Sequence, residues 1–195
     1  MSRGTDGGML VILSGPSGSG KTTICTRLLA DGDYERSVSV TTRPPRAGET
    51  DGKDYWFTDR EDFLRKVEEG YFAEHAEYCG RFYGTPLAPL KEAVAGGRVV
   101  FLVIEVDGAQ QIREQFPDAL SLFVEAPSPE VAEDRLRQRS ADSDAVIAAR
   151  RERARFERTQ ADAFDHVIVN DDLDTAVSEV KEIIETERKA RKGGR

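Results

Sequence analysis

The most constraining feature of the chain is a glycine-rich segment near its N-terminus. Residues 15–22 are Gly-Pro-Ser-Gly-Ser-Gly-Lys-Thr and match the pattern G-x-x-x-x-G-K-[ST] at every fixed position. A short apolar run, residues 9–14, precedes the segment, and residues 21–30 have the composition of a helix. A buried strand, a glycine-rich loop and a helix in this order predict a phosphate-binding loop in an α/β fold.

The residue types in this loop suit the binding of a nucleoside triphosphate. Glycines let successive backbone N–H groups converge on phosphate oxygens, and the helix N-terminus adds its positive end. Lys21 can reach the β- and γ-phosphates, and the hydroxyl of Thr22 can bind Mg²⁺. The alternative is a chance turn before a helix, which the flanking strand and helix disfavour. The motif alone leaves kinases, GTPases, ATPases and transport motors open.

Strand-like and helical segments alternate at both ends of the chain, which indicates a central parallel sheet flanked by helices. The longest apolar run, residues 99–106, is expected to be a central strand, and residues 173–189 the last helix. Two charged segments interrupt this alternation, the first at about residues 41–89 and the second at about residues 127–155, with a helix break near 140–143. Further strands are expected at residues 37–40, 120–125 and 166–169, and short antiparallel strands within 71–83.

The first interrupting segment carries a second cluster of functional residue types. Arg43 and Arg46 stand on a proline-stiffened loop, where two guanidinium groups can clamp one phosphate. Tyr55 and Tyr83 can add hydroxyl donors to the same phosphate. The alternative is a solvated basic loop, and the cluster alone does not decide between the two.

Charge and composition limit the class of protein. The net charge is −8, which argues against a general nucleic-acid binder. The sequence contains no run of about 18 apolar residues, so we expect no membrane span. Residues 1–8 lack the apolar core of a signal peptide. The two cysteines, Cys25 and Cys79, lie far apart without metal-ligand spacing, so we expect a reducing cytoplasm and a buried Cys25 that fills space.

Three motifs together resemble the guanylate kinase family. The first motif is S-V-T-T-R-P-P-R-A-G-E-T-D-G-K-D-Y at residues 39–55, the second runs from Glu74 to Tyr83-Gly84-Thr85, and the third is V-I-V-N-D at residues 167–171. The likeness extends from about residue 10 to about residue 180. It implies a P-loop kinase fold that transfers a phosphoryl group from ATP, with Mg²⁺, to GMP and also to dGMP.

The resemblance assigns roles to individual residues. Guanine presents donors at N1 and its 2-amino group and an acceptor at O6, so a carboxylate and a hydroxyl suit it. The GMP phosphate would be held by Arg43, Arg46, Tyr55 and Tyr83, and the base would face Ser39, Glu74, Gly84 and Thr85. ATP would contact Gly15, Pro16, Ser17, Gly18, Ser19, Gly20, Lys21, Thr22, Thr23 and Asn170.

Arginines of the second interrupting segment would act on the transferring group. The resemblance implies that Arg135, Arg139 and Arg150 belong to a closing lid and, with Lys21 and Arg43, neutralise its charge. Other arginines of this segment, such as Arg137 and Arg151, are expected on a solvated helix face.

The chain departs from the family at the end of its central strand. The family has two acids in the pattern L-D-I-D-x-Q-G, and here Val103 replaces the first, while Glu105 and Asp107 follow. The sequence does not decide which acid takes the missing role; we favour Glu105 as a functional residue near GMP and Asp107 as a structural one.

The expected organisation is one domain, residues 9–188. Its core is residues 9–40, 90–126 and 156–188; residues 41–89 bind GMP, 127–155 form the lid, and 1–8 and 189–195 are flexible ends. We expect a monomer or homodimer without a nucleic-acid or membrane partner. Two alternatives remain: a related kinase of another phosphate monoester, such as a ribose bisphosphate, and a non-catalytic module that binds phosphopeptides. The second would lack an intact phosphate loop.

Overall fold

The computed structural model describes the backbone of residues 8–139 and 144–193, and the side chains of residues 8–138 and 151–192. The chain forms two compact units. The first contains residues 8–12 and 33–120, and the second contains residues 13–32 and 121–193. Strand β1 (Met9–Ser14), which is buried along its whole length, contributes to both units.

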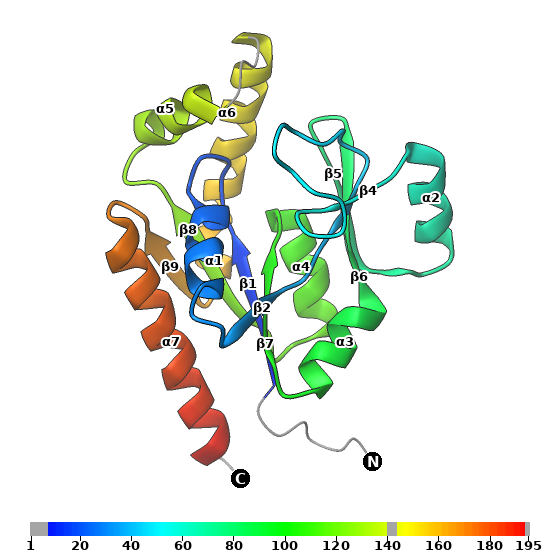
Figure 1. The fold of residues 1–195 in the computed structure, drawn as a ribbon. Helices are drawn as coiled ribbons and strands as arrows, with labels where there is room; N and C mark the ends of the chain where they lie inside the picture. The colour runs from blue at the N-terminus through cyan, green and yellow to red at the C-terminus, as the bar shows by residue number, and fades with distance from the viewer. Residues whose placement is uncertain (1–7, 140–143, 194–195) are drawn as a thin grey trace. The chain divides into compact units, whose positions relative to one another are not determined.

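A five-stranded sheet has the strand order β2-β7-β1-β8-β9 (Figure 1). In the first unit β2 pairs in parallel with β7, and in the second β8 pairs in parallel with β9. The prediction of an α/β fold with a central parallel sheet is confirmed. The strands around β1 are β2 (Tyr34–Arg36), β7 (Val99–Val103), β8 (Leu120–Glu125) and β9 (His166–Val169).

The first unit holds a second sheet of four strands in the order β4-β3-β6-β5. Strands β5 and β6 form an antiparallel hairpin, as predicted for residues 71–83. Helix α2 covers this sheet with Phe63, which is fully buried and stacks on Phe72 at a ring distance of 4.7 Å. The elements are β3 (Val40–Thr41), β4 (Trp56–Phe57), α2 (Arg60–Glu68), β5 (Phe72–Tyr78), β6 (Arg81–Pro86), α3 (Leu87–Ala95) and α4 (Val106–Gln115).

Two strand predictions in the first unit were wrong. Residues 37–39, expected to belong to a strand at 37–40, connect two strands instead, because β2 ends at Arg36 and β3 begins at Val40 in the other sheet. The central strand β7 ends at Val103 instead of residue 106. Glu105 caps the N-terminus of α4 in an extended conformation, so the following Val106 already belongs to the helix.

The helices of the second unit bury apolar residues that are spaced three or four positions apart. Helix α1 buries Ile24, Cys25 and Leu28, which confirms the expected burial of Cys25. The last helix continues to Gly193, beyond the expected end at residue 189, and Arg191 pairs there with Glu187. The predicted helix break at residues 140–143 lies outside the described residues. The helices are α1 (Lys21–Leu29), α5 (Pro129–Arg139), α6 (Asp144–Arg158), the 3-10 helix η1 (Ala161–Ala163) and α7 (Leu173–Gly193).

Among the helices in the described part of the chain, none combines the length and the apolar character needed to cross a membrane.

Candidate functional site

The loop between β1 and α1 has the conformation that its glycines predict. Gly15 and Gly20 have φ angles of 130° and 98°. A side chain at Gly15 would place a Cβ atom 2.2 Å from the carbonyl oxygen of Val124, and one at Gly20 would lie 2.1 Å from Nδ2 of Asn170. Both positions therefore require glycine on account of backbone angle and of space.

Lys21 is the first residue of α1 and is nearly buried, with 9% of its surface exposed. Its ammonium group donates to the carbonyl oxygen of Gly15 and to that of Pro16, the second at 3.2 Å. Thr22 and Thr23 follow in the first helical turn and are exposed. The lysine is thus held within the loop, and both threonine side chains lie at the helix N-terminus, where an anion is favoured.

Asn170 fixes the loop from the end of β9. Its Nδ2 donates to the carbonyl oxygen of Ser19 at 2.8 Å, and Arg135 donates to the carbonyl oxygen of Asn170 at 3.1 Å. Among the described residues, Nη1 of Arg135 and Oδ1 of Asn170 are buried without a hydrogen-bond partner. A pocket of about 260 Å³ opens here, lined by Gly20, Thr23, Arg135, Gln138, Asn170, Asp171 and Leu173. A donor and an acceptor buried without partners next to a pocket fit a polar ligand.

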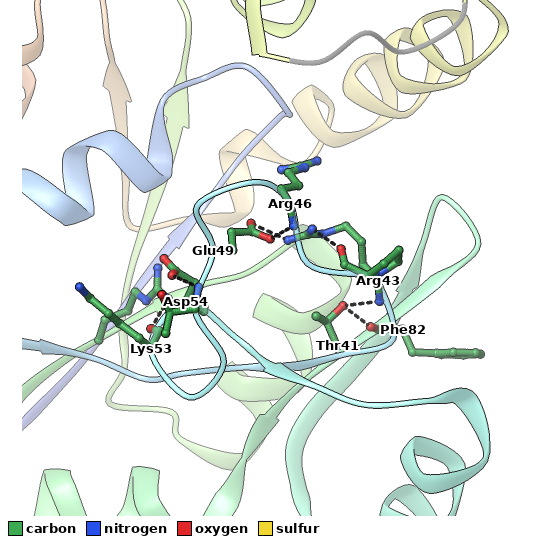
Figure 2. A network of polar contacts seen from close by, with 10 residues as sticks. Thr41, Arg43, Arg46, Glu49, Lys53, Asp54 and Phe82 are labelled. Atoms are coloured by element: carbon green, nitrogen blue, oxygen red, sulfur yellow. Dashed lines mark hydrogen bonds and ion pairs between the residues drawn. The ribbon is translucent and has the colours of Figure 1, made fainter.

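In the first unit Arg43 lies at the centre of a polar cluster (Figure 2). Its guanidinium group donates to the carboxylate of Glu49 at 2.7 Å and to the carbonyl oxygen of Pro44 at 2.7 Å. The same group lies over the ring of Tyr55 at 5.3 Å, and the rings of Tyr55 and Tyr83 are 6.1 Å apart. The structure therefore brings together three of the four residues predicted to hold the acceptor phosphate.

The fourth residue, Arg46, joins the cluster only through its backbone. Its N–H donates to the second carboxylate oxygen of Glu49 at 2.7 Å, while its exposed side chain extends away from Glu49 (Figure 2). Glu49 thus bonds to both predicted phosphate-binding arginines, a role that the sequence analysis did not assign. The available signal was an acid three residues after Arg46 in the same loop.

The ionised forms of Arg43 and Glu49 stabilise each other. Burial opposes the charge of Arg43, but the hydrogen bond and negative charge of Glu49 outweigh it and raise the pKa of the guanidinium group. Burial likewise opposes the charge of Glu49, whose pKa is lowered by hydrogen bonds from Arg43 and Arg46. Burial raises the pKa of Tyr55, so its phenol remains a hydrogen-bond donor at neutral pH.

Glu74 and Thr85 form the second part of the cluster, opposite each other on β5 and β6. The hydroxyl of Thr85 donates to Oε1 of Glu74 at 2.6 Å, and both residues are buried. Burial raises the pKa of Glu74 to about 7, the hydrogen bonds of Thr85 oppose this rise, and the charge of Glu105 adds to it. Glu105 also raises the pKa of Tyr55, so it acts on both parts of the cluster.

The remaining predicted residues divide into described and undescribed positions. Ser39 is half-buried directly before β3, and Gly84 lies in β6, where a Cβ atom would be 2.8 Å from the ring of Phe72. Asp107 lies in the first turn of α4. The side chains of Arg139 and Arg150 lie outside the described residues; their backbones belong to α5 and α6.

Comparison with known proteins gives one consistent result. The family model described as guanylate kinase matches residues 7–187. A guanylate kinase of Streptococcus thermophilus is 46% identical over 182 residues, which cover 92% of this chain and 87% of that protein. One of Synechocystis is 46% identical over 91% of this chain and 93% of its own length. The crystal structure of guanylate kinase from Anaplasma phagocytophilum superposes with a TM-score of 0.77 at 37% identity, covering 95% of this chain and 88% of that one.

Proposed function

Because this chain belongs to the guanylate kinase family, we propose that it transfers the γ-phosphoryl group of ATP to GMP and forms ADP and GDP. The protein is a nucleoside monophosphate kinase. One oxygen of the GMP phosphate attacks the γ-phosphorus, the bond from that phosphorus to the bridging oxygen of ADP breaks, and the enzyme contributes position and charge.

The phosphate loop is the site for ATP. Its backbone N–H groups and the N-terminus of α1 surround the phosphates, and Lys21, already held in the loop, follows the charge that develops on the β–γ bridge. The adenine base occupies the pocket beside Asn170, whose buried Oδ1 atom has no partner among the described residues. Nη1 of Arg135, also buried without a partner there, remains for the phosphates.

The hydroxyl of Thr22 suits Mg²⁺, which prefers oxygen ligands. Within the described residues no group of three or more His, Cys, Asp or Glu side chains is placed to hold a metal. Mg²⁺ would arrive with the phosphates of ATP and would offset part of their charge. The protein supplies Thr22 as its ligand.

The polar cluster of the first unit is the site for GMP. Arg43, Tyr55 and Tyr83 already converge and would bind the phosphate, with the exposed side chain of Arg46 turning toward it. Glu74 accepts hydrogen bonds from N1–H and from the 2-amino group, and Ser39 supplies a hydroxyl donor to the base. Thr85 faces the base but gives its hydroxyl proton to Glu74. The single observation that carries this assignment is the carboxylate of Glu74, buried and oriented by Thr85, because a buried acceptor selects a base with donors at these positions.

Two segments of the chain have separate tasks. Residues 41–89 hold GMP, and residues 127–155 form a lid that brings Arg135, Arg139 and Arg150 to the transferring group. The same site accepts dGMP, because none of the assigned residues binds the 2′-hydroxyl. The reaction belongs to the cytoplasm, a reducing compartment that suits the free cysteines Cys25 and Cys79.

A coupled assay of ADP formation tests this function. With ATP and Mg²⁺, we expect turnover with GMP and dGMP, and rates at least about 10³-fold lower with AMP, CMP and UMP, because the buried carboxylate opposes their bases. Binding of GMP without ADP formation would point instead to a non-catalytic module, and equal rates with all acceptors would contradict the role of Glu74.

A further inference from the structure

Helix α4 covers one edge of β5 through two glutamine side chains. Strand β5 is the last strand of the four-stranded sheet in the described part of the chain. Nε2 of Gln111 donates to the carbonyl oxygen of His75 at 2.9 Å, and Oε1 of Gln111 accepts from the N–H of His75 at 3.2 Å. Nε2 of Gln115 donates to the carbonyl oxygen of Ala73 at 2.6 Å. The helix thus satisfies backbone groups that a neighbouring strand would otherwise pair.

The two glutamines bond to the residues on either side of Glu74. Ala73 and His75 flank this carboxylate in the sequence, so the backbone of β5 is fixed on both sides of it. The side chain of Glu74 itself lies against Gly108 of the same helix. A Cβ atom at Gly108 would be 2.4 Å from Oε2 of Glu74 and 3.1 Å from its Cδ. The carboxylate therefore occupies space that exists only because residue 108 has no side chain.

Gly108 has an ordinary helical backbone, so its conformation alone does not require glycine. Glycine in a helix costs about 1 kcal/mol relative to alanine. Residues 108, 111 and 115 are spaced by three and four positions, so they lie on one face of α4. That face contacts β5 at Glu74 and at both of its neighbours.

We propose that Gly108 and Gln111, supported by Gln115, are positioning residues that set where the carboxylate of Glu74 meets the guanine base. This inference rests on the proposed function, since it assigns a task to residues that act through Glu74. Thr85 holds Oε1, the glutamines hold the backbone, and Gly108 admits Oε2 beside the first turn of α4. A carboxylate that accepts from two donors at once needs this orientation, because both N–H groups of the base are fixed in one plane.

The test compares Gln111→Ala with Gln110→Ala. Gln110 is the adjacent residue and is exposed, and its side chain bonds within its own helix to Glu114 at 3.3 Å, so it controls for loss of a glutamine from α4. The measurements are the KM values for GMP and ATP, kcat, and the ratio of kcat/KM for GMP to that for IMP. IMP lacks the 2-amino group, so this ratio reports how well the carboxylate reaches its second donor.

Gln111→Ala is expected to raise the KM for GMP about 10-fold and to lower the GMP:IMP ratio by a similar factor, because a displaced carboxylate loses about one hydrogen bond to the base. The KM for ATP and kcat should stay within about twofold of wild type, and Gln110→Ala should match wild type throughout. A Gln111→Ala variant that matches Gln110→Ala, or whose KM for ATP rises as much as that for GMP, overturns the inference.

Gly108→Ala provides an independent test. Alanine favours the helix, but its Cβ atom would meet the buried carboxylate of Glu74, which would have to move; the melting temperature is measured to establish that the variant is folded. We expect the KM for GMP to rise about 10-fold or more, and the same substitution to have no further effect when Glu74→Ala has removed the side chain that it meets. An equal rise with and without the Glu74 side chain would contradict the proposal.

Glu74→Gln distinguishes the base-reading role of Glu74 from the positioning roles of Gly108 and Gln111. If that variant keeps the wild-type KM for GMP and the wild-type GMP:IMP ratio, the base-reading role of Glu74 fails. If it is impaired while Gln111→Ala and Gly108→Ala behave as wild type, Glu74 keeps its role and only the positioning proposal fails.

Discussion

The side-chain nitrogen of Asn170 donates a hydrogen bond of 2.8 Å to the backbone carbonyl oxygen of Ser19. A residue that directly follows the last strand therefore fixes the phosphate loop that follows the first. The other side-chain atom of Asn170, Oδ1, is buried without a partner in the described structure and borders the pocket assigned to adenine. One asparagine thus holds the loop and, under the proposed function, would also bind the base of ATP.

Replacing Asn170 by alanine should weaken ATP binding. The change leaves the carbonyl oxygen of Ser19 without its donor, and the lost hydrogen bond should cost about 1–3 kcal/mol, equivalent to a rise of about 5- to 150-fold in the KM for ATP. The KM for GMP, measured on the same protein, should stay near the wild-type value and serves as the internal control. Equal increases in both KM values would show that the substitution damages the whole protein.

Lys21→Ala should abolish most phosphoryl transfer. The ammonium group is positioned in the loop before charge develops, and removal of one preorganised donor lowers kcat by about 10²-fold or more. The loss should appear in kcat with a melting temperature close to that of wild type. A well-folded variant with nearly wild-type turnover would refute the assignment of Lys21.

The affinity for GMP should depend on pH through Glu74. Its pKa is about 7 because it is buried, and only the ionised carboxylate accepts from both donors of guanine. The KM for GMP should therefore be constant above about pH 8 and rise about 10-fold for each unit below pH 7.

The control for this profile is Glu74→Gln, in which the phosphate of GMP still titrates but residue 74 does not. Its KM should be higher than that of wild type at pH 8 and should lose the wild-type slope. If wild type and variant have the same slope, the titration belongs to the nucleotide.

Arg139→Ala and Arg150→Ala should lower kcat by about 10²-fold with little change in the KM for ATP, because these side chains are expected to act on the transition state. Arg137→Ala is the matched control. Arg137 lies in α5 and pairs on the exposed surface with Glu133, and its removal should leave kcat unchanged. Variants of Arg139 and Arg150 that raise only the KM for ATP would instead be defective in substrate binding.

Local signals were sufficient for the phosphate loop. The glycines of the G-x-x-x-x-G-K-[ST] pattern determine the backbone angles of the loop. Strand β1, the loop and the start of α1 therefore occur where the sequence predicts them. The hairpin that places Glu74 opposite Thr85 was also expected, because its aromatic and glycine-broken sequence favours short antiparallel strands.

Features that depend on distant partners could not be predicted. Residues 37–40 look like one strand, yet Arg36 pairs with Phe101 while Val40 pairs with Gly84 in a different sheet. The run at residues 99–106 is uniformly apolar, so its periodicity does not show where the strand ends and the helix begins. The same limit applies to Gln111, whose importance depends on the backbone of His75, 36 residues earlier in the sequence.

The most direct measurement of the central claim follows the phosphoryl group itself. ATP labelled at its γ-phosphorus is incubated with GMP, Mg²⁺ and the protein, and the products are separated. If the proposed reaction is right, one labelled GDP, with the label in its β-phosphate, forms for each ADP. Label that appears as inorganic phosphate, or ADP that forms at the same rate without GMP, would contradict it.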